Sequence, residues 1–314
     1  MGMNPSQANA LLALGNSLRE AGYRFMTVTP STHRRINCRP GNERANDLRG
    51  VFGWSRPFAP DLLPGAMLDL MREAGVLESV DGGLLKAGLR VSSLGGLLFF
   101  HSAWPTREDD AVFFGPDTYR FVGTMERAFA WLGSGPTRAL EIGCGAAPAA
   151  ITIADRFPHA EVIAADINPR ALDLSVVNAR LAMLDNFAAC RSDLFDGLHG
   201  DFDLIVANPP YILDQDERPY RHGGGERGAE ISRRIVEEGL ARLRPGGSLM
   251  LYTGVAISGP DDHFLESVRP TLERVCGHWS YDELDPDIFG GQLGEPGYED
   301  VERLAAVWLH AVKR

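Results

Sequence analysis

The sequence is poor in cysteine and contains no long apolar run. Its four cysteines are scattered, with no close pair of the kind that structural zinc or dithiol redox sites use, so we expect neither a metal site nor a disulfide. No stretch approaches the roughly 18 consecutive apolar residues of a membrane span, and the N-terminus lacks the basic and then apolar pattern of a secretory signal. We therefore expect a cytoplasmic protein with no membrane contact.

Positive charge is also scarce, and it is unevenly placed. The net charge of -11 argues against wholesale nucleic-acid binding, yet residues 1–105 contain 11 Lys and Arg against 8 Asp and Glu. Residues 31–56 hold a basic run that we interpret as a solvated face, with contact to a polyanion as the alternative. The arginines of this run are Arg34, Arg35, Arg39, Arg44, Arg49 and Arg56.

The length of 314 residues favours two domains, and residues 1–108 are predicted to form the smaller one. Apolar residues recur at near-helical spacing over residues 6–22 and again over residues 61–74. Short β-prone runs separated by glycine pairs follow between residues 84 and 100. Helices followed by a hairpin indicate a small α+β, winged-helix-like domain, to which we assign substrate recognition.

Residues 109–314 alternate strand and helix signals. Apolar runs at 139–142, 161–165, 187–190, 202–207 and 248–253 predict five strands separated by helices, and two C-terminal runs near 279–284 and 304–311 predict closing antiparallel strands. This pattern predicts an α/β, Rossmann-like fold with a mostly parallel seven-stranded sheet. Such sheets bind ligands beyond the carboxyl ends of their strands.

The predicted ligand site begins with the glycines that follow the first strand. Gly143 and Gly145 let a ligand approach the backbone closely, but Pro148 stands where a dinucleotide fingerprint needs a third glycine, which favours a ligand without pyrophosphate. Asp166 ends the second strand and is placed to accept ribose hydroxyls, and Asp193 follows the third strand and is placed near an adenine amino group. Plain turns for the glycines and helix N-caps for the aspartates are the alternatives.

These motifs resemble, in order, the cofactor motifs of class I methyltransferases, and the resemblance covers roughly residues 110–314. It implies S-adenosyl-L-methionine as the cofactor. The residues expected to bind the cofactor are Thr118, Glu141, Gly143, Cys144, Gly145, Asp166, Ile167, Asp193, Leu194 and Asn208.

The most specific signal is Asn208-Pro209-Pro210-Tyr211, directly after the fourth strand. The Asn208 side-chain oxygen and the Pro209 carbonyl can accept hydrogen bonds from a planar amino or amide group and help turn its lone pair toward a methyl donor. Consecutive prolines hold these acceptors still, and Tyr211 can stack on a flat substrate. We interpret the tetrapeptide as catalytic, with a simple turn as the alternative.

The tetrapeptide resembles that of amino methyltransferases acting on adenine N6, cytosine N4 or protein glutamine. The segment Phe113 to Thr118 and the glycine-rich stretch from Gly223 are similar to HemK/PrmC-type glutamine methyltransferases, which implies that Asp117 and Thr118 lie near cofactor and substrate. Protein glutamine is therefore the first acceptor hypothesis, with a nucleobase or a specialised small molecule as alternatives. A regulator that only senses the cofactor is a fourth.

Overall fold

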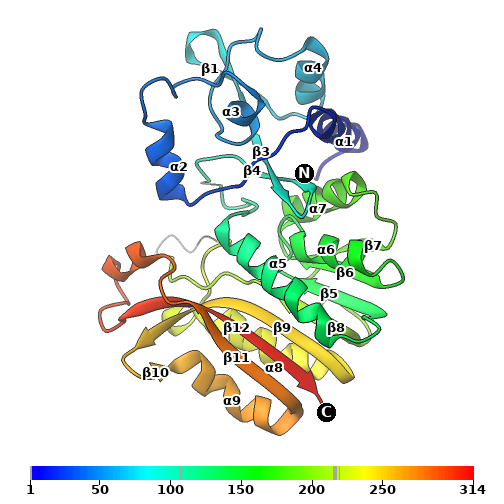
Figure 1. Cartoon of the computed structure of the whole chain (residues 1–314), viewed down its shortest axis with the longest axis vertical. Coiled ribbons are helices and arrows are strands. Elements are labelled where there is room, and N and C mark those ends of the chain that lie inside the picture. The colour runs from blue at the N-terminus through cyan, green and yellow to red at the C-terminus, as the bar shows by residue number, and fades with distance from the viewer. Residues whose placement is uncertain (1, 107, 215–217, 219) are drawn as a thin grey trace.

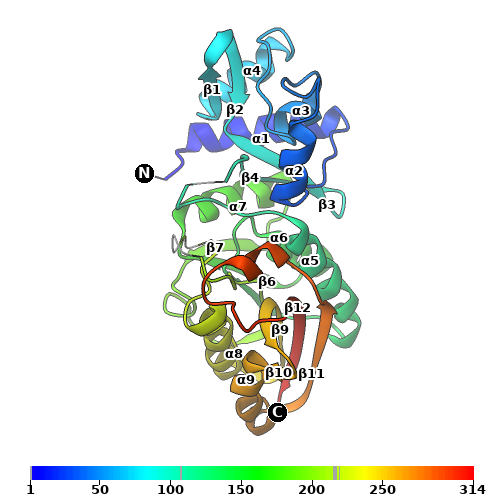
Figure 2. The same ribbon diagram turned by 90° about the vertical axis from the view of Figure 1, so that its left-hand side faces the viewer.

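The computed structural model describes residues 2–106, 108–214, 218 and 220–314. The chain is elongated, with residues 2–102, called the N-terminal part below, at one end of the long axis and a large sheet at the other (Figures 1 and 2). Among the described residues, no helix is long and apolar enough to cross a membrane.

The N-terminal part consists of helices followed by two hairpins. Its helices are α1 (Pro5–Glu20), α2 (Pro30–Asn37), α3 (Leu48–Phe52) and α4 (Gly65–Glu73), and its hairpins are β1 (Leu77–Val80) with β2 (Leu84–Ala87) and β3 (Leu89–Leu94) with β4 (Leu97–Ser102). A 3-10 turn, η1 (Asp81–Gly83), joins β1 to β2. The predicted helices at 6–22 and 61–74 are confirmed as α1 and α4, whereas the sequence did not indicate α2 or α3. The likeness to a winged helix stays a prediction.

The larger part is built on the mostly parallel sheet that the sequence predicted. Within the described residues seven strands run in the order β11-β12-β9-β8-β5-β6-β7, and the short β10 (Asp261–Asp262) pairs with β9. The strands are β5 (Arg138–Ile142), β6 (Glu161–Asp166), β7 (Phe187–Arg191), β8 (Phe202–Ala207), β9 (Leu243–Ser258), β11 (Cys276–Asp285) and β12 (Arg303–Lys313). The pairs from β7 through β9 are parallel, and β12 lies antiparallel between β9 and β11, as expected.

Helices cover both faces of this sheet because its strands alternate two apolar faces. On β8, Leu204 and Val206 pack with one core cluster, and Ile205 packs with the other. The first cluster holds α5 (Pro116–Ala128), α6 (Pro148–Arg156) and α7 (Pro169–Leu181), and the second holds α8 (Glu230–Arg242) and α9 (His263–Val275). Three further 3-10 turns are η2 (Phe129–Trp131), η3 (Glu226–Gly228) and η4 (Gly290–Gly294).

The N-terminal part shares its core with the sheet. Buried Leu11 and Leu14 of α1 belong to the same cluster as Leu174 of α7. At Gly15 the helices approach so closely that an added Cβ would lie 2.7 Å from a methyl group of Leu181. The chain crosses between the two parts through residues 103–115, and the division at residues 108 and 109 stays a prediction.

Asn178 of α7 ties three segments together. Its side chain is fully buried, donates to the carbonyls of Phe100 and Ala146 at 3.1 Å each, and accepts from the Phe100 amide at 2.8 Å. Phe100 lies on β4 and Ala146 lies in the glycine loop after β5. One side chain therefore holds the N-terminal hairpin against the loop that the sequence assigned to the cofactor.

We expect Asn178→Ala to lower the free energy of unfolding by about 3 kcal/mol or more, because it leaves three buried backbone groups without partners. Urea denaturation measures the loss. The matched control is Asn9→Ala at the exposed rim of the same helix pair, where Asn9 accepts only from Arg180, and its cost should stay within about 0.5 kcal/mol. Equal effects in the two variants would show that Asn178 does not join the parts.

Candidate functional site

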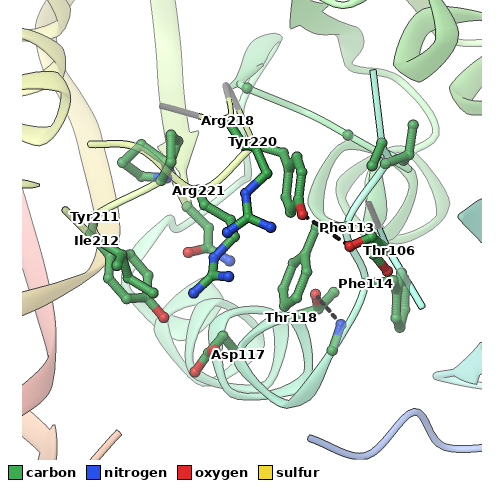
Figure 3. A pocket seen from close by; sticks show the side chains of 18 of the residues that line it. Thr106, Phe113, Phe114, Asp117, Thr118, Tyr211, Ile212, Arg218, Tyr220 and Arg221 are labelled. Carbon is green, nitrogen blue, oxygen red and sulfur yellow. Dashed lines mark hydrogen bonds between the residues drawn. The ribbon is translucent and has the colours of Figure 1, made fainter. Parts of the chain in front are cut away.

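One cavity of about 1040 Å³ opens at the carboxyl ends of β5, β6, β7 and β8. Figure 3 shows the wall formed by α5 and the loop after β8. The cavity brings together every residue that the sequence assigned to the site: Asp117, Thr118, Glu141, Gly143, Cys144, Gly145, Asp166, Ile167, Asp193, Leu194, Asn208, Pro209, Pro210 and Tyr211. Their placement in one cavity is a finding, and their individual roles stay predictions.

The glycine loop after β5 needs its glycines. Gly143 and Gly145 have φ of 64° and 54°, in the left-handed region that residues with a Cβ rarely adopt. A Cβ built on Gly143 would meet no protein atom within 4 Å, so the backbone faces open cavity there. This surface admits a ligand against the main chain.

Glu141 connects the end of β5 with the start of α6 through hydrogen bonds. Its carboxylate is 2% exposed and accepts from the Ala150 amide at 2.7 Å and the Ala149 amide at 3.4 Å, at the start of α6. Burial raises the pKa of Glu141 to about 8, although both hydrogen bonds oppose this change. The side chain predicted to contact the cofactor is thus already engaged with the protein backbone.

Asp166 closes the same loop from the next strand. Its Oδ2 accepts from the Gly145 amide at 2.8 Å and its Oδ1 accepts from the Asn168 amide at 2.9 Å. Burial raises the pKa of this carboxyl, and the amide hydrogen bonds oppose the rise. Asn168, not Asp166, caps α7 by accepting from the Arg170 amide, so the N-cap alternative for Asp166 is wrong. The Asp166 carboxylate still has acceptor capacity for a ligand.

Two apolar side chains and one carboxylate continue the wall beyond Asp166. Ile167 is 52% exposed although it is large and apolar, which fits a surface that a flat ligand covers. Asp193 is exposed after β7, and Leu194 adopts a positive φ of 47° beside it.

The loop after β8 presents an unpaired amide. Asn208 is half-buried, and its side chain makes no hydrogen bond to any described residue, whereas the Tyr211 ring is buried against Gly254 and Phe289. A Cβ on Gly254 would lie 2.3 Å from the Tyr211 ring, so Gly254 makes room for it. Figure 3 shows the Tyr211 hydroxyl directed toward Asp117. Burial, reinforced by Asp117, raises the Tyr211 pKa well above its usual range.

The helix that begins at Pro116 supplies Asp117 and Thr118 with their own partners. Asp117 is buried and accepts from the Tyr252 hydroxyl at 2.8 Å and from Arg120 at 3.2 Å. Thr118 Oγ1 accepts from the Gly115 amide at 3.2 Å and caps the helix (Figure 3). Both residues line the cavity, as the sequence resemblance implied.

Sequence reasoning did not single out the charged residues of the loop after Tyr211. Arg218 pairs with Asp214, and its hydrogen bonds lower the pKa of that carboxyl to about 2. Figure 3 shows Arg218 and Arg221 directed into the cavity, and the Tyr220 hydroxyl donates to the Thr106 carbonyl at 3.2 Å. The only sequence signal was the charge of this loop, which does not reveal which side chains point inward.

The basic run at 31–56 does not form one uniform solvated face. Arg34 lines the cavity, Arg35 and Arg39 are exposed, and Arg56 is buried with its Nε donating to Asn37 at 2.9 Å. Contact of this run with a polyanion has no support in this arrangement beyond the charges themselves.

The raised pKa of Glu141 predicts a pH dependence of stability. Because the folded pKa of about 8 lies above the ordinary value of 4.5, the native state binds the extra proton between these values, and this contribution to stability falls as pH rises through that window. Glu141→Gln should remove this part of the slope, measured by urea denaturation at about pH 5.5 and about pH 8. The control Glu126→Gln, at an exposed position on α5, should keep the wild-type slope. An unchanged slope in Glu141→Gln would contradict the assignment.

Part of the chain is similar in sequence to known methyltransferases. Residues 132–269 match the sequence model of the Methyltransferase small domain. The release factor glutamine methyltransferase of Deinococcus radiodurans is 39% identical over 124 residues, which cover 36% of this chain and 44% of that protein. The enzyme of the same name from Rhodopirellula baltica is 34% identical over 165 residues, covering 48% of this chain and 53% of that protein.

The ribosomal protein uL3 glutamine methyltransferase of Neisseria meningitidis is 31% identical over 127 residues, covering 37% of this chain and 42% of that protein. The chain thus spans about half the length of the curated relatives it matches. The strand order of the sheet, the glycine loop and the tetrapeptide after β8 all lie in or around the matched segment. Residues 132–269 therefore match the Methyltransferase small domain, and the chain is similar to glutamine methyltransferases over part of its length.

Proposed function

We propose that this chain is an S-adenosyl-L-methionine-dependent methyltransferase that methylates the side-chain amide nitrogen of a protein glutamine. The observation that carries the proposal is the unpaired Asn208 amide, which lines the same cavity as the glycine loop and Asp166. The curated relatives are named as glutamine methyltransferases, and this supports the choice of acceptor.

The residues around the glycine loop fit the cofactor. The Asp166 carboxylate keeps acceptor capacity for ribose hydroxyls, the backbone at Gly143 faces open space, and Ile167 offers an exposed apolar surface for the adenine ring. Asp193 accepts from the adenine amino group in this arrangement. When bound, S-adenosyl-L-methionine supplies a methyl group on a sulfonium centre.

The loop after β8 orients the acceptor nitrogen. An amide lone pair is delocalised into the carbonyl, so the nitrogen is a poor nucleophile until its plane is turned. Asn208 Oδ1 and the Pro209 carbonyl accept hydrogen bonds from the two N–H groups of the substrate amide and hold it in place. Pro209 and Pro210 restrict the backbone that carries these acceptors. Transfer would break the sulfur–methyl bond of the donor and form a nitrogen–carbon bond, with S-adenosylhomocysteine as the leaving group, and the nitrogen would lose one proton to water. No strong general base is needed from the chain.

Transfer of a labelled methyl group into fractionated cell extract tests the proposal. We expect the label in protein, on glutamine after hydrolysis and mass spectrometry. Label in nucleic acid or in small molecules would show that the acceptor is not a protein, while the reaction would still be a methyl transfer. Cofactor binding without any S-adenosylhomocysteine would instead support a sensor and overturn the proposal.

We expect Asp166→Ala to weaken cofactor binding by about 2–4 kcal/mol, because one carboxylate holds both ribose hydroxyls and also fixes the Gly145 amide. Calorimetry with S-adenosyl-L-methionine measures the change. Asp196→Ala, at an exposed position after β7 that does not line the cavity, serves as the control. Unchanged affinity in Asp166→Ala would remove this residue from the cofactor site.

We expect Asn208→Ala to lower turnover by on the order of a hundredfold or more while leaving cofactor affinity nearly unchanged, because its oxygen acts on the acceptor during transfer. The readout is S-adenosylhomocysteine formation with the acceptor supplied, beside calorimetry of cofactor binding. Asn16→Ala, a half-buried asparagine of α1 outside the cavity, should retain full activity.

Asn208→Asp refines this test. It keeps an oxygen of the same reach, adds a charge and removes the amide donor, so partial activity is expected if the acceptor role dominates. Full activity in Asn208→Ala would mean that the tetrapeptide is only a turn.

A further inference from the structure

The N-terminal wall of the cavity contains a buried arginine without a carboxylate partner. Arg90 on β3 is 5% exposed and lines the cavity. Its Nε donates to the Ser102 carbonyl at 3.1 Å, and this is the one hydrogen bond that its side chain makes to the described part of the chain. No ion pair joins Arg90 to any described residue.

Such an arrangement is costly in the isolated protein. A guanidinium removed from water without a counter-charge loses solvation that one carbonyl replaces only in part. Burial accordingly lowers the pKa of Arg90 to about 10, and the groups that oppose this fall are the phenols of Tyr23 and Tyr119. Burial lowers the pKa of His33 to about 4, and the positive charge of Arg90 adds to this fall.

The other arginines that line the cavity have carboxylate partners. Arg120 pairs with Asp117 at 3.2 Å and with Asp285 at 2.9 Å. Arg218 and Arg221 share the carboxylate of Asp214, at 2.5 Å and 3.8 Å. Among the described arginines of this cavity, Arg90 and Arg34 of the N-terminal wall are thus the ones without an ion pair to a described residue.

The same wall adds a second cation and several hydrogen-bond donors. Arg34 of α2 is exposed, lines the cavity and has no ion pair among the described residues. Thr29 and Ser31, at the start of α2, also line it, where the helix dipole favours negative charge. The opposing charge on this wall is Asp109, an exposed residue of the connection to α5.

We propose that this wall, formed by Arg90, Arg34 and the start of α2, binds a carboxylate of the methyl acceptor. The inference rests on the proposed function, since it concerns a second contact made by the same substrate. The planar fork of one buried guanidinium matches a carboxylate, and the net charge of -11 disfavours a long polyanion. In a protein acceptor, the carboxylate is that of an acidic residue near the methylated glutamine.

Anion-induced stabilisation of the full chain tests this site without any turnover. The melting temperature is measured with increasing succinate or inorganic phosphate against sodium chloride of equal ionic strength, because a ligand that binds only the native state raises it. Three variants are compared with the wild type: Arg90→Met, Arg34→Gln and, as a control, Arg35→Gln. Arg35 has the same charge on the same helix and does not line the cavity.

We expect succinate to stabilise the wild type and Arg35→Gln beyond the salt effect. Its apparent affinity should fall about tenfold or more in Arg90→Met and about threefold in Arg34→Gln. Without anion, Arg90→Met should melt at or above the wild-type temperature, because it removes an uncompensated buried charge. A merely structural arginine would instead give a lower melting temperature and an unchanged succinate response.

The proposal is overturned if succinate stabilises no more than sodium chloride, or if Arg90→Met and Arg34→Gln respond like the wild type. If only phosphate stabilises the wild type and this effect is lost in Arg90→Met, the wall binds a phosphoryl group and not a carboxylate, and the proposal is wrong in its ligand. Should Arg90→Met fail to fold, Arg34→Gln decides. The assay needs neither cofactor nor methyl transfer. If succinate binds but no methyl transfer occurs, the proposed function is refuted and the wall remains a carboxylate-binding site.

Discussion

Two acidic side chains hold the glycine loop after β5 and the start of α6, and the geometry of the cavity depends on them. Glu141 is buried and precedes the last residue of β5, and Asp166 is half-buried and ends the neighbouring parallel strand β6, so the register of β5 with β6 sets the distance between them. Glu141 receives the first amides of α6, and Asp166 receives the Gly145 amide between the glycines. Both sets of amides need such acceptors, because the left-handed Gly145 lies outside regular secondary structure and the first amides of a helix have no partner within the helix.

Asn178 extends this constraint to the N-terminal part. It binds the carbonyl of Ala146 in the loop and both backbone groups of Phe100 on β4. Arg90 lies on β3, which pairs with β4 in the hairpin. The hydrogen bonds of Asn178 therefore place the N-terminal wall of the cavity relative to the glycine loop. The wall that we propose to bind the acceptor and the loop assigned to the cofactor are therefore connected through one buried side chain.

The elements that could be predicted are those with a local pattern. Strand β8 and the tetrapeptide at Asn208 could be located because a short apolar run ends in an unmistakable polar turn. Helix α2 was missed because its sequence, Pro30 to Asn37, has no apolar periodicity and buries only His33. The partners of Glu141 and the isolation of Arg90 could not be predicted, since both depend on contacts that form only when distant segments meet.

The segment that matches the family model contains some of the residues that line the cavity but not others. Gly143, Asp166 and Asn208, to which we assign cofactor binding and methyl transfer, lie inside residues 132–269, the segment that matches the family model. Arg34 and Arg90 lie outside that segment but line the same cavity. The family match therefore says nothing about the N-terminal wall, and the acceptor contact that we propose there has to be tested on Arg34 and Arg90 themselves.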